Sequence, residues 1–198
     1  MRSNKKLLLI SGTPATSFGS VERSYIELCK YLVNFDYEVY FIFTEEGIVS
    51  EHLKKIGVKV FFVRMHKKID PVAILKIFQI LKKVNPNVVH IHFELALYNS
   101  LFSVFFFRVT SLLKHKNLSL IIHHHSFPLK RGTSWKYAIR RTLYKLLNVY
   151  AVFVSEAQKN VLVNMGVIPS NIKKLSLIIL SIQLYFILGR QRRKKYVF

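Results

Sequence analysis

The sequence is poor in cysteine, and this scarcity excludes two classes of protein. Cys29 is the one cysteine in the chain of 198 residues. One thiol cannot form an internal disulfide framework or a cysteine metal cluster, and it is typical of a protein kept in a reducing compartment. The sequence also lacks a long apolar run near its start, because only Leu7 to Ile10 stand before Ser11 and Gly12. An export signal needs roughly 7–15 apolar residues, so we expect a first β-strand here and not a secretory leader.

Acidic residues are scarce as well, and the excess of basic residues indicates an anionic partner. The chain has 31 Lys and Arg against 10 Asp and Glu, a formal net charge of +21. Seven of the bases and none of the acids lie in residues 173–198, which leaves 24 bases against 10 acids and a net charge of +14 for the rest. Such a charge suits an anionic phospholipid surface or nucleic acid. The bases are scattered and no nucleic-acid-binding motif is present, so we expect no nucleic-acid partner.

Apolar, β-rich runs alternate with helix-periodic segments along the chain. We expect strands at residues 6–11, 37–43, 58–64, 87–93, 118–125 and 149–155. We expect helices at residues 20–34, 49–57, 71–85, 95–113, 134–147 and 156–166, the third of them capped by Asp70. Strands alternating with helices of this length imply right-handed βαβ crossovers. The predicted fold class is therefore α/β: a Rossmann-like single domain with a doubly wound parallel sheet.

The loops that follow the strands are the places where a ligand would bind, because ligands on such sheets lie at the carboxyl ends of the strands. The first loop, "SGTPATSFGS", holds Gly12 and Gly19 and opens into a helix at Ser20. Glycine there lets backbone N–H groups approach a phosphate at the helix N-terminus. The loop has neither a P-loop nor a GxGxxG pattern, so a phosphate-binding loop and a plain strand-to-helix turn both stay open.

Histidines stand at the ends of two expected strands. Side chains alternate along a strand, so His90 and His92 share one face, as do His123 and His125, and we expect both pairs to approach one crevice. A zinc site is the obvious hypothesis, but no nearby carboxylate or cysteine completes a ligand set, so we expect no metal. Hydrogen bonding at a strand end suits His90 and His124. Contact with a ligand hydroxyl, or action as a base, suits His125.

Two further groups of polar residues have both a structural and a functional interpretation. Ser155 is a plausible helix cap, with Glu156 and Gln158 complementing the helix dipole, and this does not exclude a ligand role. Four arginines either steer an anionic group or form a solvated basic face. They are Arg23, Arg131, Arg140 and Arg141.

Several segments together resemble a known family. In order they are "FGSVERSYIELCKYL", "YEVYFI", "PNVVHIHF", "IIHHHSF" and "VFVSEAQKNVLVNMGVIPSNIKKL". Their order and spacing are similar to those of glycosyltransferase family 4, over about residues 5–174. The resemblance implies the N-terminal, acceptor-side Rossmann-like domain of a GT-B enzyme.

The resemblance also implies roles for individual residues. In that family the first loop reads Gly-Gly-x-Glu against the donor diphosphate, whereas Ser20 replaces the second glycine here. The histidine that follows the fifth strand faces the reacting sugar in the family, and the "HIH" and "SEAQK" segments match as well. The expected catalytic residues are then His125 and Glu22, and the loop against the donor phosphates contains Gly19 and Ser20. The acceptor crevice would be lined by His92, Arg23, Ser155 and Glu156.

Members of the family transfer a sugar from a nucleotide donor and generally retain its anomeric configuration. The resemblance thus implies a hexosyl-transferring enzyme of polysaccharide biosynthesis, with a polysaccharide or lipid-linked acceptor. It implies no metal and no cofactor other than the nucleotide-sugar substrate. A basic acceptor domain would rest on an anionic membrane, so we expect a cytoplasmic protein at the inner face of the membrane.

The residues after the resemblance ends differ in composition from the rest. We expect a domain over residues 1–174 and an apolar, basic tail over 175–198 outside the fold. The family's second domain, with its Glu-x(7)-Glu donor motif, does not follow, so we expect a truncated transferase whose reading frame is lost near Leu175 and which is inactive alone. The alternative is a non-catalytic peripheral membrane or interaction protein that uses the basic face and the tail. The apolar run Leu175–Leu188 is shorter than the roughly 20 residues of a membrane span.

Overall fold

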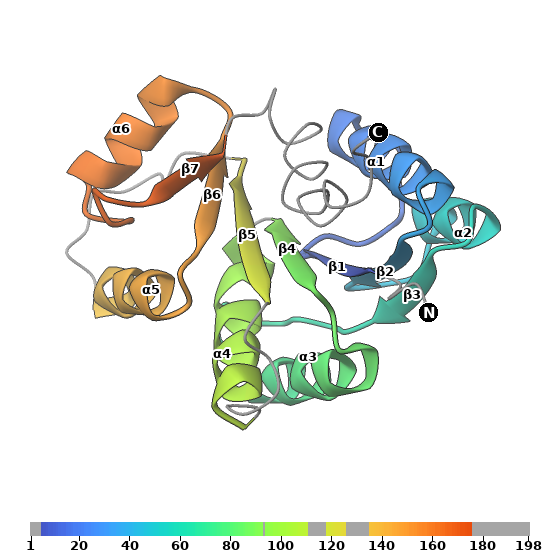
Figure 1. The fold of residues 1–198 in the computed structure, drawn as a ribbon, viewed down its shortest axis with the longest axis horizontal. Helices are drawn as coiled ribbons and strands as arrows, with labels where there is room; N and C mark the ends of the chain where they lie inside the picture. The colour runs from blue at the N-terminus through green and yellow to red at the C-terminus, as the bar shows by residue number, and fades with distance from the viewer. Residues whose placement is uncertain (1–4, 93, 111–117, 126–134, 176–198) are drawn as a thin grey trace, which may run out of the picture.

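A seven-stranded parallel sheet forms the centre of the protein in the computed structural model, which describes residues 5–92, 94–110, 118–125 and 135–175. The strands lie in the order β3-β2-β1-β4-β5-β6-β7 (Figure 1). They are β1 (Lys6–Ser11), β2 (Glu38–Phe43), β3 (Lys59–Phe62), β4 (Val88–His92), β5 (Ser119–His124), β6 (Tyr150–Phe153) and β7 (Lys173–Leu175). Each neighbouring pair is parallel, as the alternation of strands and helices predicts.

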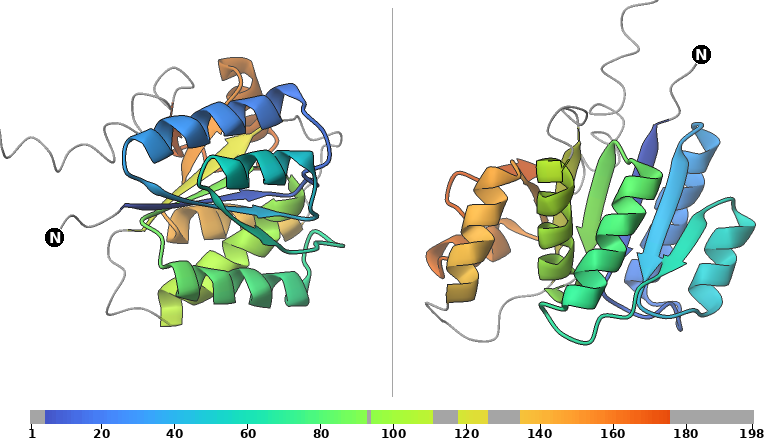
Figure 2. Two further views of the ribbon diagram at one scale, coloured as in Figure 1. Left: turned by 90° about the vertical axis from the view of Figure 1, so that its right-hand side faces the viewer. Right: turned by 90° about the horizontal axis from the view of Figure 1, so that it is seen from below.

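Helices cover both faces of the sheet (Figures 1 and 2). The helices α1 (Ser20–Asn34) and α2 (Ile48–Lys55) bury Tyr25, Cys29 and Leu53 against one face. The other face is covered by α3 (Pro71–Val84), α4 (Glu94–Thr110) and α5 (Trp135–Leu146), and α6 (Glu156–Asn164) adds Leu162 to the same core. The expected doubly wound, Rossmann-like α/β fold is therefore confirmed.

The direction of the chain reverses between β1 and β4. From β1 the chain proceeds through β2 to β3, and α3 then returns it to β4 on the other side of β1. Ser11 and His92, the last residues of β1 and β4, are partners in the register of the two strands. Loops that leave a doubly wound sheet in opposite directions open a crevice at this point, which is the usual ligand position of the fold.

The predicted elements agree with the structure to within a few residues, with one addition. The expected strands and helices all occur, and α4 packs on the sheet through Leu97, Leu101 and Phe107 as expected of a sheet-covering helix. The added strand is β7, where two lysines and one leucine give no strand pattern. None of the helices described by the structure is both apolar enough and long enough to span a bilayer.

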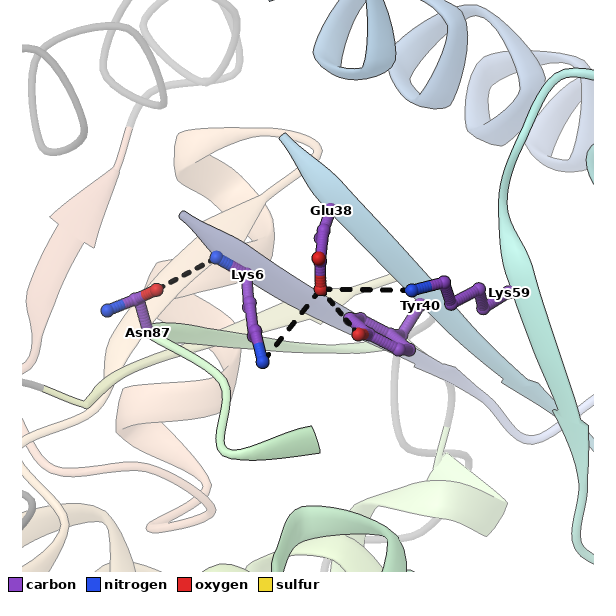
Figure 3. A network of polar contacts seen from close by, with 5 residues as sticks. All are labelled: Lys6, Glu38, Tyr40, Lys59 and Asn87. Atoms are coloured by element: carbon purple, nitrogen blue, oxygen red, sulfur yellow. Dashed lines mark hydrogen bonds and ion pairs between the residues drawn. The ribbon is translucent and has the colours of Figure 1, made fainter. Parts of the chain in front are cut away.

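Charged and polar residues join the strands at the edge where they begin (Figure 3). Glu38 Oε2 accepts a hydrogen bond of 2.6 Å from Tyr40 Oη and lies 3.8 Å from Lys6 Nζ and 3.9 Å from Lys59 Nζ. The backbone N–H of Lys6 donates to Asn87 Oδ1 at 2.8 Å. These contacts tie β1, β2, β3 and β4 together at the edge opposite the strand ends that carry the histidines.

Replacing Asp70 by alanine is expected to reduce the free energy of unfolding by about 1–2 kcal/mol, the usual effect of losing a helix cap. Asp70 Oδ1 accepts from Val72 N at 3.1 Å and Ala73 N at 3.3 Å, as the sequence predicts. Its Oδ2 also accepts from His66 N at 3.2 Å. Urea unfolding would measure the change. The control Glu27→Gln removes an exposed ion pair with Lys30 and should change the free energy by less than about 0.5 kcal/mol. An equal loss in both variants would contradict the capping argument.

Candidate active site at the carboxyl ends of the strands

Four histidines, two from β4 and two from the end of β5 and the residue after it, pack together on the face of the sheet that α1 covers. His92 and His123 are register partners, and their ring centroids are 5.3 Å apart. The centroids of His90 and His92 are 4.1 Å apart, and those of His123 and His125 are 4.0 Å apart. The two pairs predicted from strand alternation therefore do meet, at the reversal point of the sheet.

A hydrogen bond of 3.0 Å joins His92 Nδ1 to His125 Nε2 across the two strand ends. Tyr25 of α1 packs edge-on against His92, with 4.6 Å between the ring centroids. Tyr25 is in turn held by Phe41 of β2, at 5.2 Å. The aromatic contact fixes His92, and the hydrogen bond fixes His125, the residue that the family resemblance places at the reacting sugar.

The environment keeps these histidines neutral. Burial lowers the pKa of His125 to about 4, and burial together with His125 lowers the pKa of His123 to about 3. Burial, followed by the neighbouring imidazoles, holds the pKa values of His90 and His92 well below 6.5. Near pH 7 His125 is therefore an uncharged ring that can donate or accept a hydrogen bond, and it is a weak base.

Three buried ring nitrogens in this cluster have no hydrogen-bond partner among the described residues. They are both nitrogens of His90 and Nε2 of His92. The expectation of a hydrogen-bonded His90 is therefore wrong: its neighbours are the apolar Leu9 and Ile121 in the register of the adjoining strands. An unpaired buried polar group typically costs about 1–3 kcal/mol, so the cluster is retained at a cost to stability.

His124 points to the opposite face and confirms its predicted hydrogen bonding. Its Nδ1 lies 3.1 Å from a guanidinium nitrogen of Arg140, and its Nε2 lies 3.3 Å from Tyr144 Oη. Arg140 is only 1% exposed, so it does not form part of a solvated basic face. Arg141 donates to the backbone oxygen of Gly166, and Arg131 lies outside the described residues.

The loop between β1 and α1 ends in a capped helix. Glu22 Oε2 accepts the backbone N–H of Gly19 at 3.1 Å, and α1 begins at Ser20. A carboxylate at this position stabilises the positive end of the helix dipole. Arg23 is exposed on the first turn. The structure thus joins Glu22 to Gly19 and His92 to His125, as two separate pairs.

The same loop is held by its neighbour between β2 and α2. Ala15 N donates to the backbone oxygen of Glu45 at 3.3 Å, and Val49 N donates to Ala15 O at 3.0 Å. Gly12 lies against the start of α4, where an added Cβ would be 2.7 Å from Ala96 N. The backbone at the crevice is therefore closely packed from two sides.

The residues after β6 form the helix cap that the sequence predicts. Ser155 Oγ accepts from Gln158 N at 3.1 Å, and Glu156 forms an ion pair of 2.9 Å with Lys159. Gln158 was expected to complement the dipole, but it is fully buried, and its Oε1 accepts from Val154 N at 3.0 Å. Ser155 and Glu156 follow β6, which pairs with β5 and so places them near the end that carries His125.

The sequence did not identify Tyr25 as a component of the site, nor the burial of Arg140 on the opposite face of the sheet. Tyr25 belongs to an ordinary amphipathic pattern on α1, and its contact with His92 depends on the pairing of β1 with β4. Arg140 lies in a basic helix with nothing in the local sequence to indicate burial.

Comparisons with known proteins agree with this fold. The family model described as Glycosyltransferase Family 4 matches residues 21–176. A crystal structure of a glycosyltransferase from Rickettsia africae ESF-5 has a TM-score of 0.68 and 21% identity, over 88% of this chain and 43% of that one. The chain thus spans less than half the length of that glycosyltransferase.

Two other solved structures show weaker similarity. The NADH-dependent reductase A1-R′ gives a TM-score of 0.49 and 13% identity, over 93% of this chain and 89% of that one. MurG of Acinetobacter baumannii gives 0.44 and 10%, over 87% of this chain and 67% of that one. No curated protein matches the chain.

Proposed function

The chain belongs to glycosyltransferase family 4, and from this membership we propose that it is the acceptor-side domain of a retaining glycosyltransferase. The full enzyme would move a hexosyl group from a nucleotide sugar to a polysaccharide or lipid-linked acceptor. In this reaction the bond from the anomeric carbon to the donor phosphate breaks, and a bond to an acceptor hydroxyl oxygen forms. The proton of that hydroxyl passes to the departing phosphate, and we propose that the step uses no metal.

The observation that supports this proposal is the His92–His125 pair at the reversal point of the sheet. A neutral imidazole can hold a sugar hydroxyl through a hydrogen bond without attracting a counter-ion to the donor site. We assign that role to His125, with His92 as a positioning residue. The family motif corresponds to Gly19 and Ser20 for the donor phosphates, and we infer that the other donor contacts come from residues outside the part of the chain that the structure describes.

Glu22 has a role compatible with this assignment. Its carboxylate accepts a hydrogen bond from the backbone N–H of Gly19. A donor phosphate would approach the same N–H group at the start of α1. We therefore propose that Glu22 holds the loop in place and moves when the donor binds. Arg23, Ser155 and Glu156 are proposed to line the acceptor crevice.

The experiment that tests the proposal is glycan binding by the 198-residue chain. The fluorescently labelled chain is applied to an array of polysaccharide fragments and lipid-linked glycans. We expect binding to a subset of these, weakened at least tenfold by His125→Ala, because the variant loses the hydrogen bond to the sugar. His66→Gln, on an exposed residue of the loop that follows the edge strand β3, should bind like the wild type. No glycan bound, or equal binding by both variants, would refute the assignment.

A related expectation concerns turnover. The purified chain, mixed with radiolabelled UDP- and GDP-sugars and a membrane extract as the acceptor source, should transfer no sugar above the background. The reason is that transfer requires donor contacts which we assign to a second domain. Robust transfer by this chain would show that its own residues complete the donor site.

We also propose that the domain rests on an anionic membrane surface, at the cytoplasmic side. The support is the surface around α3, where exposed Val72 and Leu75 are 61% and 55% accessible. Five exposed lysines surround them: Lys67, Lys68, Lys76, Lys82 and Lys83. Apolar side chains framed by lysines suit the interface of a bilayer that contains acidic lipid. The apolar tail, also considered as an anchor, lies outside the described residues from 176 onward.

Replacing Lys76, Lys82 and Lys83 together by glutamate is expected to weaken binding to phosphatidylglycerol vesicles at least about 100-fold. The reason is that each lysine near such a surface contributes about 1 kcal/mol. Vesicle flotation across a range of lipid concentrations measures the change, and added salt should reduce wild-type binding.

The matched control places the same three charge changes at Lys30, Lys54 and Lys55, on the two helices of the opposite layer. It should retain most of the binding. Equal losses in both triple variants would mean that overall charge, and not the face of α3, attracts the lipid.

A further inference from the structure

The histidine cluster has more ring nitrogens than the proposed transferase role requires. His125 would contact the sugar and His92 would position it, which leaves His90 and His123 without a part in that chemistry. His90 is fully buried and both of its nitrogens are unpaired among the described residues, as is Nε2 of His92. A buried donor or acceptor without a partner is uncommon in native proteins and calls for a ligand or ion that would satisfy it.

The positions of these nitrogens fit a single metal ion. One ligand nitrogen from each of His90, His92 and His123 can be chosen so that all three lie within 4.8 Å of one another. Three imidazoles around one Zn²⁺ at about 2.0–2.1 Å would be about 3.3–3.4 Å apart in a tetrahedron. Small rotations of the rings toward a common centre would close that difference.

We propose that His90, His92 and His123 bind one divalent transition-metal ion, with Zn²⁺ as the reference ion. Imidazole is a preferred ligand for Zn²⁺, Cu²⁺ and Ni²⁺, and three histidines plus a solvent molecule are a complete tetrahedral set. A cysteine or carboxylate ligand is therefore not needed to complete the set. The hard ions Mg²⁺ and Ca²⁺ prefer oxygen ligands, so we expect them not to bind here.

The hydrogen bond between His92 and His125 completes the geometry of the site. It occupies Nδ1 of His92 and leaves Nε2, the unpaired nitrogen, for the metal. Histidine ligands are usually oriented by a second group at the other ring nitrogen, which here is His125. His123 is only partly buried, so an ion can enter from the side of this residue.

The inference does not depend on the proposed transferase activity. Sugar transfer as proposed uses no metal, and the ion would bind Nε2 of His92, the ring nitrogen that is not bonded to His125. Metal binding is therefore measured directly on the free chain. Failure of glycan binding would leave this test intact, and failure of metal binding would leave the glycan assignment intact.

The test uses the full 198-residue chain, purified without a polyhistidine tag, stripped with EDTA and desalted. Zn²⁺ is titrated at neutral pH in competition with a chromophoric chelator. We expect one equivalent of Zn²⁺ to bind and the midpoint of thermal unfolding to rise with Zn²⁺ concentration. Mg²⁺ should produce neither effect. Absence of a bound equivalent, or an equal response to Mg²⁺, would overturn the proposal.

Variants then distinguish this site from adventitious binding. His123→Gln, at the partly buried ligand, should lower the affinity for Zn²⁺ by about 100-fold or more and abolish the thermal shift. His125→Gln should lower it by about 10–100-fold, as expected of a residue that orients a ligand. His66→Gln is the control and should bind like the wild type. Far-UV circular dichroism and thermal unfolding in EDTA establish that each variant is folded.

The result for His123→Gln decides the question. A folded variant that keeps its full affinity and its thermal shift would show that the ion binds elsewhere. Should this variant fail to fold, Co²⁺ added to the wild type gives a separate readout. Visible absorption typical of a four-coordinate ion supports the site, and its absence refutes it.

Discussion

Lowering the pH from 7 to 5 in the presence of EDTA is expected to reduce the free energy of unfolding by several kcal/mol. Five histidines at the strand ends have lowered pKa values, chiefly because of burial: His90, His92, His123, His124 and His125. In the unfolded chain each has a pKa of about 6.5. Between the unfolded and folded pKa values the unfolded state binds more protons, so stability rises with pH and is lost as the pH falls below about 6.5.

The expected size of this loss follows from the pKa values. His123 and His125 titrate at about 3 and about 4 in the folded protein. Each therefore loses on the order of 2 kcal/mol of stabilisation between pH 7 and pH 5. His90, His92 and His124 shift in the same direction, so the total loss is a substantial part of the free energy of unfolding of an ordinary domain, about 5–15 kcal/mol.

Urea unfolding followed by circular dichroism, at several pH values from 7 to 5 with EDTA present, measures the effect. In His123→Gln one titrating group is gone, so the free energy of unfolding should depend less steeply on pH. Its decrease between pH 7 and pH 5 should be about 2 kcal/mol smaller than that of the wild type. The control Gln79→Ala changes an exposed residue of α3 that does not titrate and should show the wild-type slope. A free energy of unfolding that does not change between pH 7 and pH 5 would contradict the burial of these rings.

Most of the fold could be predicted because each element carries a local signal. Asp70, Pro71 and the left-handed Asn85 mark both ends of α3, and Gly57, with φ of 92°, closes the turn after α2. The strand β7 could not be predicted, because its three residues form a strand only by pairing with β6, and "KKL" has no apolar alternation. Tertiary pairing, not local propensity, determines such a short edge strand.

The candidate site was predicted in part, for a related reason. Alternation along a strand placed His92, His123 and His125 on one face, and the parallel register brings them together. What could not be predicted is how completely the rings are enclosed, because this depends on Tyr25 and the distant β2. Burial turns four ordinary histidines into a neutral cluster with unpaired nitrogens, and burial is a property of the assembled fold.

Replacing Gly47 by alanine is expected to destabilise the protein by about 3 kcal/mol, at the upper end of the range for overpacking. The cause is steric and not conformational, because φ at Gly47 is 175°, an extended value that any residue adopts. A Cβ there would collide with the carbonyl oxygen of Ala15 and lie 2.7 Å from its carbonyl carbon and 2.8 Å from Thr16 Cα. These are backbone atoms, so no side-chain rotation relieves the contact.

The loop that holds Ala15 cannot easily move away, and this connects Gly47 to the site. Hydrogen bonds to Glu45 and Val49 fix Ala15 from both sides, and the same loop continues to Gly19 at the start of α1. Gly47→Ala should therefore also weaken glycan binding. The control Gly57→Ala meets no close contact, since its Cβ would be 3.7 Å from Val33, and it suffers only the cost of a positive φ, about 1–2 kcal/mol.

Urea unfolding and the glycan array, applied to both variants, separate the two mechanisms. Gly47→Ala should lose more stability than Gly57→Ala and should bind glycans more weakly than the wild type, while Gly57→Ala keeps its binding. If Gly57→Ala were the more damaging variant, the loop between β1 and α1 would yield to the added methyl group. In that case the close packing of the two loops would not be what holds the loop between β1 and α1 in place.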